Sequence, residues 1–443
     1  MSGPAARTDL GQGSGHGLVL SDDTGAPRAL AFAYTRYLAA SCRRFLAAGP
    51  ELPAVLRPAH ATVAGLVRQG LEGNQAPMLA CFTSAAVGTP LQCVGLREEL
   101  EPFRARIDAA AMHIIPHLLL EMGLRQLIPA GQSVLWEHDA PRLASLAIGG
   151  ALFPPEAAFG LRFSASHLAA VGHHGEVGRL PMDPAVMRRA LAEGNTGFRF
   201  ARCFRRTGAD AYLATIDHNP LAAFEAHPDK AGNHIDLGGR SVDEWVAVLE
   251  PVLDLIERFL PGEFAEMEML LHEIIPVGYD GTRHLSASYR EAVGTIYLTL
   301  HPNPMTMAEA VLHEFQHNKL NVSAYSVEYL TNAFHPLYKS PVRPDPRPLW
   351  GILLAVHAFL PITELYRRMR NAGHAWATRP DFEQRMSEVD LKNHEGMEML
   401  RAHARFTPAG RGLFDDLERL ERGHMEDRKA RGLETTPTAS HLS

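Results

Sequence analysis

Two histidines and a glutamate in the segment LHEFQHNKL have the types and the spacing of a metal site. His313 and His317 stand four positions apart, and Glu314 directly follows the first of them. On a helix of 3.6 residues per turn, side chains at i and i+4 differ in direction by only about 40°, so both imidazoles can point at one ion. This HExxH pattern predicts a metal centre that the paired histidines hold and the adjacent glutamate serves.

Two imidazoles do not hold a catalytic ion, so the pattern requires a third ligand. The metzincin continuation is excluded, because Leu320 and Ser323 occupy the positions of its glycine and its third histidine. The downstream candidates are Glu328, His335 in an expected turn, and His357 in the apolar run LWGILLAVHAFLPITELY. An unpaired imidazole is costly in such a run, so His357 is either a ligand or a satisfied core residue.

The proline-rich stretch YKSPVRPDPRPLWG, at 338–351, presents two arginines and an aspartate. Its prolines restrict the backbone and predict a stiff loop. Arg343 and Arg347 suit an anion clamp, because a guanidinium binds a carboxylate through two parallel hydrogen bonds. The same stretch also fits a turn in which Asp345 pairs with the arginines and caps the next helix. Both interpretations stay open at this point.

The elements around the HExxH pattern are those that such a site needs. A helix is expected over 305–321, with Thr306 and Glu309 as a capping box at its start. The run GTIYLTL, at 294–300, predicts a strand against which this helix can pack.

Helical patterns dominate both ends of the chain, and short β-like runs fill its centre from about 131 to 220. The remaining expected elements are helices over 56–73, 97–124, 242–260, 349–370, 380–405 and 411–430, and a strand over 267–277. This order predicts an α+β fold with a helical N-terminal region, a central mixed β region and a helical C-terminal metal-binding part. The expected domains are a helical region at 18–130 and an α+β catalytic domain at 131–433, with disordered ends at 1–17 and 434–443.

Composition excludes several functional classes. The 443 residues carry a net charge of −7, which provides no basic surface for nucleic acid or anionic lipid. No run approaches the about eighteen consecutive apolar residues of a membrane span, so no membrane association is expected. The four cysteines form no CxxC pair, which excludes a thiolate zinc module and a disulfide scaffold and predicts a cytoplasmic protein. The sequence does not predict an oligomeric state.

Three motifs taken together resemble a known family. They are SASYREAVGTIYLTL, LHEFQHNKL and RPDPRPLWGILLAVHAFL, within roughly 280–370, with weaker support from YLATIDHNP at 212–220. They are similar to those of the HExxH-motif proteins encoded beside ribosomally synthesised, modified peptides. Those proteins were first described as metallopeptidases and are now understood as iron(II)- and 2-oxoglutarate-dependent peptide β-hydroxylases.

The resemblance implies a role for each matching residue. His313 and His317 would bind Fe(II), with His357 as the third ligand. Glu314 would be a direct ligand or a group that contacts the ligands. Arg343 or Arg347 would hold the distal carboxylate of 2-oxoglutarate, and the implied substrate is a ribosomally synthesised precursor peptide.

This ligand set departs from the usual pattern of such oxygenases, in which two histidines and one carboxylate bind the iron. HxD tripeptides, which could supply a His–Asp pair, occur at His227–Asp229 and His234–Asp236. Both lie in a polar, glycine-containing stretch, where loop structure is expected.

Two other functions stay open. A zinc metallopeptidase would use the same helix, with zinc lowering the pKa of bound water and Glu314 acting as general base. Alternatively, the chain would only bind a peptide through its N-terminal helices, with an inactive metal site. Imidazoles suit both iron and zinc. The arginine loop favours the hydroxylase, because a peptidase needs no clamp for an acidic co-substrate.

Overall fold

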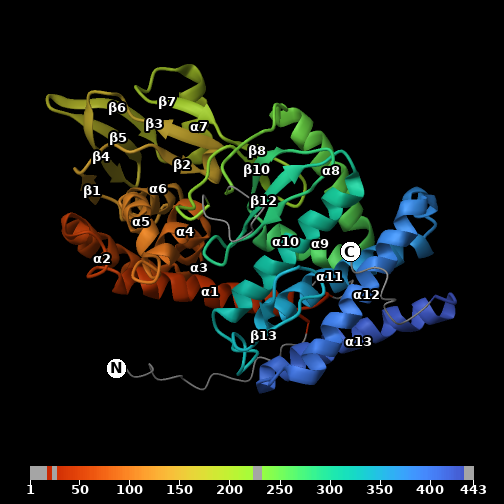
Figure 1. Cartoon of the computed structure of the whole chain (residues 1–443). Coiled ribbons are helices and arrows are strands. Elements are labelled where there is room, and N and C mark those ends of the chain that lie inside the picture. Colours follow the sequence, from red (N-terminus) through yellow and green to blue (C-terminus); the bar gives the residue numbers. More distant parts are fainter. Residues whose placement is uncertain (1–16, 22–26, 223–231, 434–443) are drawn as a thin grey trace. The chain divides into compact units, whose positions relative to one another are not determined.

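The computed structural model describes residues 17–21, 27–222 and 232–433, and it confirms the α+β class (Figure 1). Helices occupy 28–124, β-sheets occur between 133 and 300, and helices return over 304–430. The expected disordered ends, apart from Gly17, and the His227–Asp229 tripeptide lie outside the described residues.

The chain forms two compact units. The larger unit contains 32–255 and 266–318, and the smaller unit contains the N-terminal residues to 31, 256–265 and the chain from 319 onward. The domain boundaries expected from the sequence stay a prediction.

The helices of the larger unit come mostly from the N-terminal third of the chain, and α6 packs on α2, α4 and the strands β2 and β4. They are α1 (Arg28–Ala47), α2 (Arg57–Gly73), α3 (Gln75–Ala80), α4 (Ala85–Val94), α5 (Arg104–Ala111), α6 (Ile114–Leu124), α7 (Pro184–Glu193) and α8 (Val242–Phe259), of which α1 and α8 extend slightly beyond the unit. The helical segment expected over 97–124, with breaks at Pro102 and Pro116, is divided instead between Ala111 and Ile114, and Pro116 lies within α6.

Three sheets complete the larger unit. An antiparallel sheet has the order β1 (Ser133–Trp136), β4 (Ala158–Ser164), β5 (His167–Gly172), β6 (Gly175–Pro181). A smaller antiparallel sheet has the order β2 (Leu143–Ser145), β3 (Gly150–Phe153), β7 (Arg199–Arg202). The third is mixed, with the order β11 (Ser286–Ala287), β12 (Thr295–Leu300), β10 (Glu273–Tyr279), β9 (Tyr212–Ala214), β8 (Phe204–Arg206).

The mixed sheet has a parallel centre. Strand β10 pairs in parallel with β12 on one side and with β9 on the other. Every residue of β12 is buried, as the unbroken apolar and β-branched run TIYLTL predicts for a central strand. The expected strand over 294–300 is confirmed.

The expected strand over 267–277 is wrong in its first half. Met267–Leu270 belong to the helix α9 (Pro261–Leu270), and the strand β10 begins at Glu273. The segment EFAEMEML has good helix formers throughout, and this local preference outweighs the apolar run that follows it.

Helix α10 (Pro304–Ala324) carries the HExxH pattern and is longer than expected. The carboxamide oxygen of Asn303 accepts a hydrogen bond from the backbone N–H of Met305 at 3.1 Å, so Asn303 caps the helix. The expected capping box at Thr306 and Glu309 is therefore wrong. The helix begins at Pro304, a residue type that is common at the first helical position, so Thr306 already lies within the first turn.

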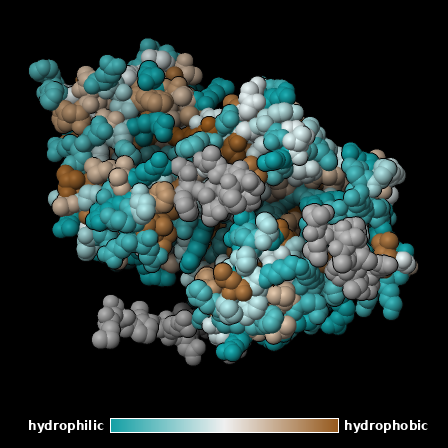
Figure 2. Space-filling view, viewed as in Figure 1, coloured by the Kyte–Doolittle hydropathy of each residue, from teal (hydrophilic) through white to brown (hydrophobic). Residues whose placement is uncertain are grey.

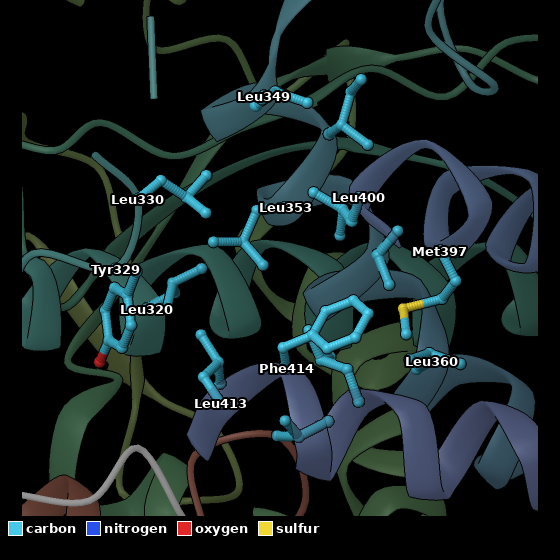
Figure 3. Close-up of a cluster of buried hydrophobic side chains, with 14 of the residues drawn as sticks. Leu320, Tyr329, Leu330, Leu349, Leu353, Leu360, Met397, Leu400, Leu413 and Phe414 are labelled. Carbon is cyan, nitrogen blue, oxygen red and sulfur yellow. The ribbon is translucent and has the colours of Figure 1, made fainter. Parts of the chain in front are cut away.

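The smaller unit is built on three long C-terminal helices that pack on one another. They are α11 (Leu349–Asn371), α12 (Pro380–His403) and α13 (Pro408–Ala430), with a two-stranded ribbon of β13 (Leu337–Tyr338) and β14 (Arg347–Pro348). Figure 3 shows their shared core, in which Leu320 from the end of α10 lies with Leu353, Leu400, Leu413 and Phe414.

Two helical stretches are long and apolar enough to cross a membrane by length and composition alone. They are Glu101–Leu124 and Leu349–Asn371, and 72% and 78% of their most apolar windows are buried inside the protein. On the face shown in Figure 2, hydrophobic side chains lie in small separate groups among hydrophilic ones.

A buried ion pair lies inside the smaller unit. The Nζ of Lys319 is 3.0 Å from Oε1 of Glu263, and both side chains are fully buried. The backbone N–H of Ser21 also donates to Oε1, at 2.7 Å. A buried carboxylate is tolerated here because a cation and a backbone donor together replace its hydration.

We expect Lys319→Met to lower the free energy of unfolding by about 3–5 kcal/mol, because it leaves the Glu263 carboxylate buried without a cation. The double variant Lys319→Met/Glu263→Gln should recover much of this loss, because the buried residue at position 263 is then neutral. Urea denaturation followed by circular dichroism measures both. The exposed Lys392→Met is the matched control, and a single variant as stable as that control would contradict the expectation.

Candidate metal centre

The two histidines of the HExxH pattern lie against one another in the larger unit, as their spacing predicts. Their ring centroids are 4.3 Å apart, with the ring planes at 74°. Both residues are half-buried on α10. The i, i+4 relation has therefore placed two imidazoles where one ion can contact both.

The state of His317 suits a metal ligand. Burial lowers the pKa of its imidazole, while the nearby Glu314 carboxylate acts in the opposite direction. The neutral form is the one that binds metals. The Nδ1 of His317 is buried and makes no hydrogen bond with the described residues. A cation beside this ring would satisfy a nitrogen that the described protein groups do not.

Glu314 is fixed by a residue from the strand region upstream. Its side chain is buried, and its Oε2 accepts a hydrogen bond from the Oγ of Ser288 at 2.7 Å. Ser288 directly follows the edge strand β11, which pairs with β12. The carboxylate is thereby oriented by the sheet, and its remaining lone pairs can serve a ligand.

Asn318 joins α10 to the start of β12. Its Oδ1 accepts from the backbone N–H of Gly294 at 2.8 Å, and its Nδ2 donates to the carbonyl of Thr295 at 3.1 Å. Gly294 has a φ of +82°, which favours glycine at this turn. These two bonds fix the rotation of the helix one residue after His317.

The proposed third ligands belong to the smaller unit. The Nε2 of His357, which is fully buried on α11, donates to the carbonyl of Leu18 at 2.8 Å. Metal binding through Nε2 would require this bond to be given up. Glu328 and His335 are both exposed, beyond the end of α10. Among residues 17–21, 27–222 and 232–433, no group of three or more His, Cys, Asp or Glu side chains is placed to hold a metal. The third ligand stays a prediction.

The arginine loop also belongs to the smaller unit, and its arginines share one carboxylate. The Nε of Arg343 is 3.2 Å from Asp345, and the Nε of Arg347 is 2.8 Å from it. The Asp–Arg pairs expected from the sequence are present. Two guanidinium groups on one carboxylate leave a net positive charge, so a role in holding 2-oxoglutarate stays a prediction.

A second histidine pair at i and i+4 provides a contrast. The Nδ1 of His117 donates to the carbonyl of His113 at 2.8 Å, and its Nε2 accepts from the backbone N–H of Ala144 at 3.2 Å. Both ring nitrogens are used, so His117 has a structural role in this unit.

Sequence reasoning missed two acids beside the mixed sheet: the half-buried Asp217, just after β9, and the buried Glu273 at the start of β10. Burial raises the pKa of Asp217 to about 6, although the Tyr297 hydroxyl donates to it at 3.0 Å. Burial also raises the pKa of Glu273 to about 8, and the nearby Asp217 charge adds to this effect. The sequence feature that could have indicated Glu273 is a lone acid inside an apolar run, LLHEIIPV. Of the HxD residues, His234 and Asp236 lie in a loop, as expected, apart from a single bridge from Asp236 to Val277.

Comparisons with models of protein families and with curated proteins found no match to this chain.

The raised pKa of Glu273 gives a pH-dependent stability. Its protonated form is favoured in the folded state, so this contribution is complete below the unfolded pKa near 4.5 and is lost as pH rises toward 8. We expect Glu273→Gln, which stays neutral, to match the unmodified protein near pH 4.5. Near pH 8 it should be more stable by up to a few kcal/mol. Thermal unfolding at several pH values measures this. The exposed Glu268→Gln should keep the same difference in stability from the unmodified protein at every pH. If Glu273→Gln does the same, the expectation is contradicted.

Proposed function

We propose that this protein is an iron(II)- and 2-oxoglutarate-dependent oxygenase that hydroxylates the β-carbon of a residue in a ribosomally synthesised peptide. One observation carries the proposal. Three of the four segments on which the family resemblance depends are linked by hydrogen bonds, and two of these bonds reach residues of α10 next to the paired histidines.

Three contacts support this. Ser288 and Gly294, from the motif SASYREAVGTIYLTL, bond to Glu314 and Asn318 of the motif LHEFQHNKL. Tyr297, also from the first motif, donates to Asp217 of YLATIDHNP.

The chain's own residues account for binding and orientation. His313 and His317 would hold the metal, with His357 as the proposed third ligand. Glu314, oriented by Ser288, would contact the metal or a group bound to it. Arg343 or Arg347 would hold the distal carboxylate of the co-substrate. Iron with 2-oxoglutarate and O₂ supplies the oxidising power that hydroxylation of a C–H bond requires and that side chains lack.

The alternative is a zinc metallopeptidase, and the position of Glu314 favours it. This buried carboxylate lies on the same helix as the histidine pair, as a general base for zinc-bound water would. The two functions differ in the metal, in the need for 2-oxoglutarate and in the product.

The test is anaerobic reconstitution with Fe(II) or Zn(II), 2-oxoglutarate and a candidate precursor peptide, followed by addition of oxygen. We expect succinate and a one-oxygen gain in peptide mass with Fe(II) only. Cleavage of the peptide with Zn(II), without succinate, would replace the proposal by the peptidase. Turnover with neither metal would reject both.

We expect His317→Ala to abolish metal uptake and leave the circular dichroism spectrum unchanged, because the described residues make no hydrogen bond to its Nδ1. Metal content after dialysis, measured by mass spectrometry, checks this. The exposed His174→Ala, in a turn of the same unit, is the matched control. Global unfolding of His317→Ala, or metal uptake equal to that of the control, would contradict a role in metal binding.

A further inference from the structure

The larger unit contains a cavity whose polar groups are not used by the candidate metal centre. Its volume is about 470 Å³, within the range of small-ligand sites. The polar side chains that line it are Arg106, Arg142, Thr215, Asp217, Asn219, Asn233 and His234.

The two arginines outnumber the one acid, Asp217, among the residues that line the cavity. Both are exposed, and neither has an ion pair or hydrogen bond with any described residue. Most other arginines of the described chain pair with an acid, as Arg401 does with three glutamates. Two guanidinium groups at the edge of one cavity are suited to bind a carboxylate.

The floor of the cavity is fixed by hydrogen bonds to the half-buried Asp217. Oδ1 of Asp217 accepts from the Tyr297 hydroxyl and from the backbone N–H of Asn219, at 3.0 and 2.9 Å. Asn219 is only 9% exposed, and its side chain lies within reach of the Tyr297 hydroxyl, but its Nδ2 makes no hydrogen bond of good geometry within the described residues. Such a buried donor in the wall of a cavity is suited to a polar ligand.

The floor also provides an acceptor. A carboxylate carries lone pairs on both oxygens, and the contacts to Asp217 just named use Oδ1. Burial raises the pKa of this acid to about 6, so near neutral pH it is mostly ionised. A ligand that presents only negative charge would be repelled by it. A ligand with a carboxylate for the arginines and an N–H for Asp217 would satisfy both sides.

This cavity has a direct connection to the residue that orients Glu314. Asn233 donates to the hydroxyl of Tyr289 at 2.6 Å, and the neighbouring Ser288 donates to Glu314. Adjacent residues of one segment therefore contact the cavity wall and the candidate metal centre.

We propose that this cavity binds an acidic aminoacyl group, with its carboxylate on Arg106 and Arg142 and its N–H on Asp217. The group is either an aspartate or glutamate residue of a peptide or the free amino acid. The proposal concerns binding alone, and it does not depend on a metal or on hydroxylation.

The test uses the metal-free protein and a fluorescein-labelled hexapeptide of glycine and serine with one central aspartate. Its counterpart with asparagine is the neutral probe. By fluorescence anisotropy, the aspartate peptide should bind at least about ten-fold more tightly than the asparagine peptide. Arg142→Gln and Arg106→Gln should each remove most of this difference. The exposed Arg68→Gln, on α2 of the same unit, should retain it.

Competition identifies the source of the ligand. Displacement by free aspartate would assign the site to the amino acid, whereas displacement by the unlabelled aspartate peptide alone would assign it to a peptide. Equal binding of the two labelled peptides, or unchanged binding by both cavity variants, would overturn the proposal. Inorganic phosphate that competes as well as aspartate would also overturn it, because phosphate offers no N–H to Asp217.

Discussion

A polar side chain that is buried must find a partner inside the protein, and helix α10 is buried along most of its length. Three buried polar side chains in the middle of this helix have such partners. Glu314 accepts from Ser288, Asn318 bonds to Gly294 and Thr295, and Lys319 pairs with Glu263. The rotation of the helix is thereby fixed on both sides of His317. The position of the paired imidazoles is a consequence of these bonds and does not require a metal to impose it.

Much of the fold follows from local patterns. The helices near 57–73, 242–259 and 349–371 and the strand near 295–300 lie where their periodicity predicts them. Two of the errors share a cause. At Met267–Leu270 and at the start of α10, short-range preferences of a few residues decided the outcome: helix formers in the first case, and an asparagine followed by a proline in the second.

Local sequence patterns predict less of the candidate site than of the fold. The spacing of His313 and His317 is a local property, so their contact could be predicted. The partner of Glu314 could not, because Ser288 is 26 positions away and reaches it through a strand edge. Asp217 and Glu273 gain their shifted pKa values from burial, which depends on the pairing of β9, β10 and β12. The pattern of a single segment does not predict which other strands it pairs with.

The short segment Gly17–Ser21 bonds to buried side chains of the smaller unit through its main-chain groups. The carbonyl of Leu18 receives the hydrogen bond of His357, and the N–H of Ser21 reaches Glu263. Backbone groups survive almost any change of amino acid, proline at position 21 being the exception because it has no N–H. These two hydrogen bonds therefore tolerate changes in the segment's amino acids, but not a change in its length or its backbone conformation. Removal of these residues from the chain would take the Leu18 carbonyl from the buried His357 ring, and it would leave the Glu263 carboxylate with Lys319 but without the backbone donor of Ser21.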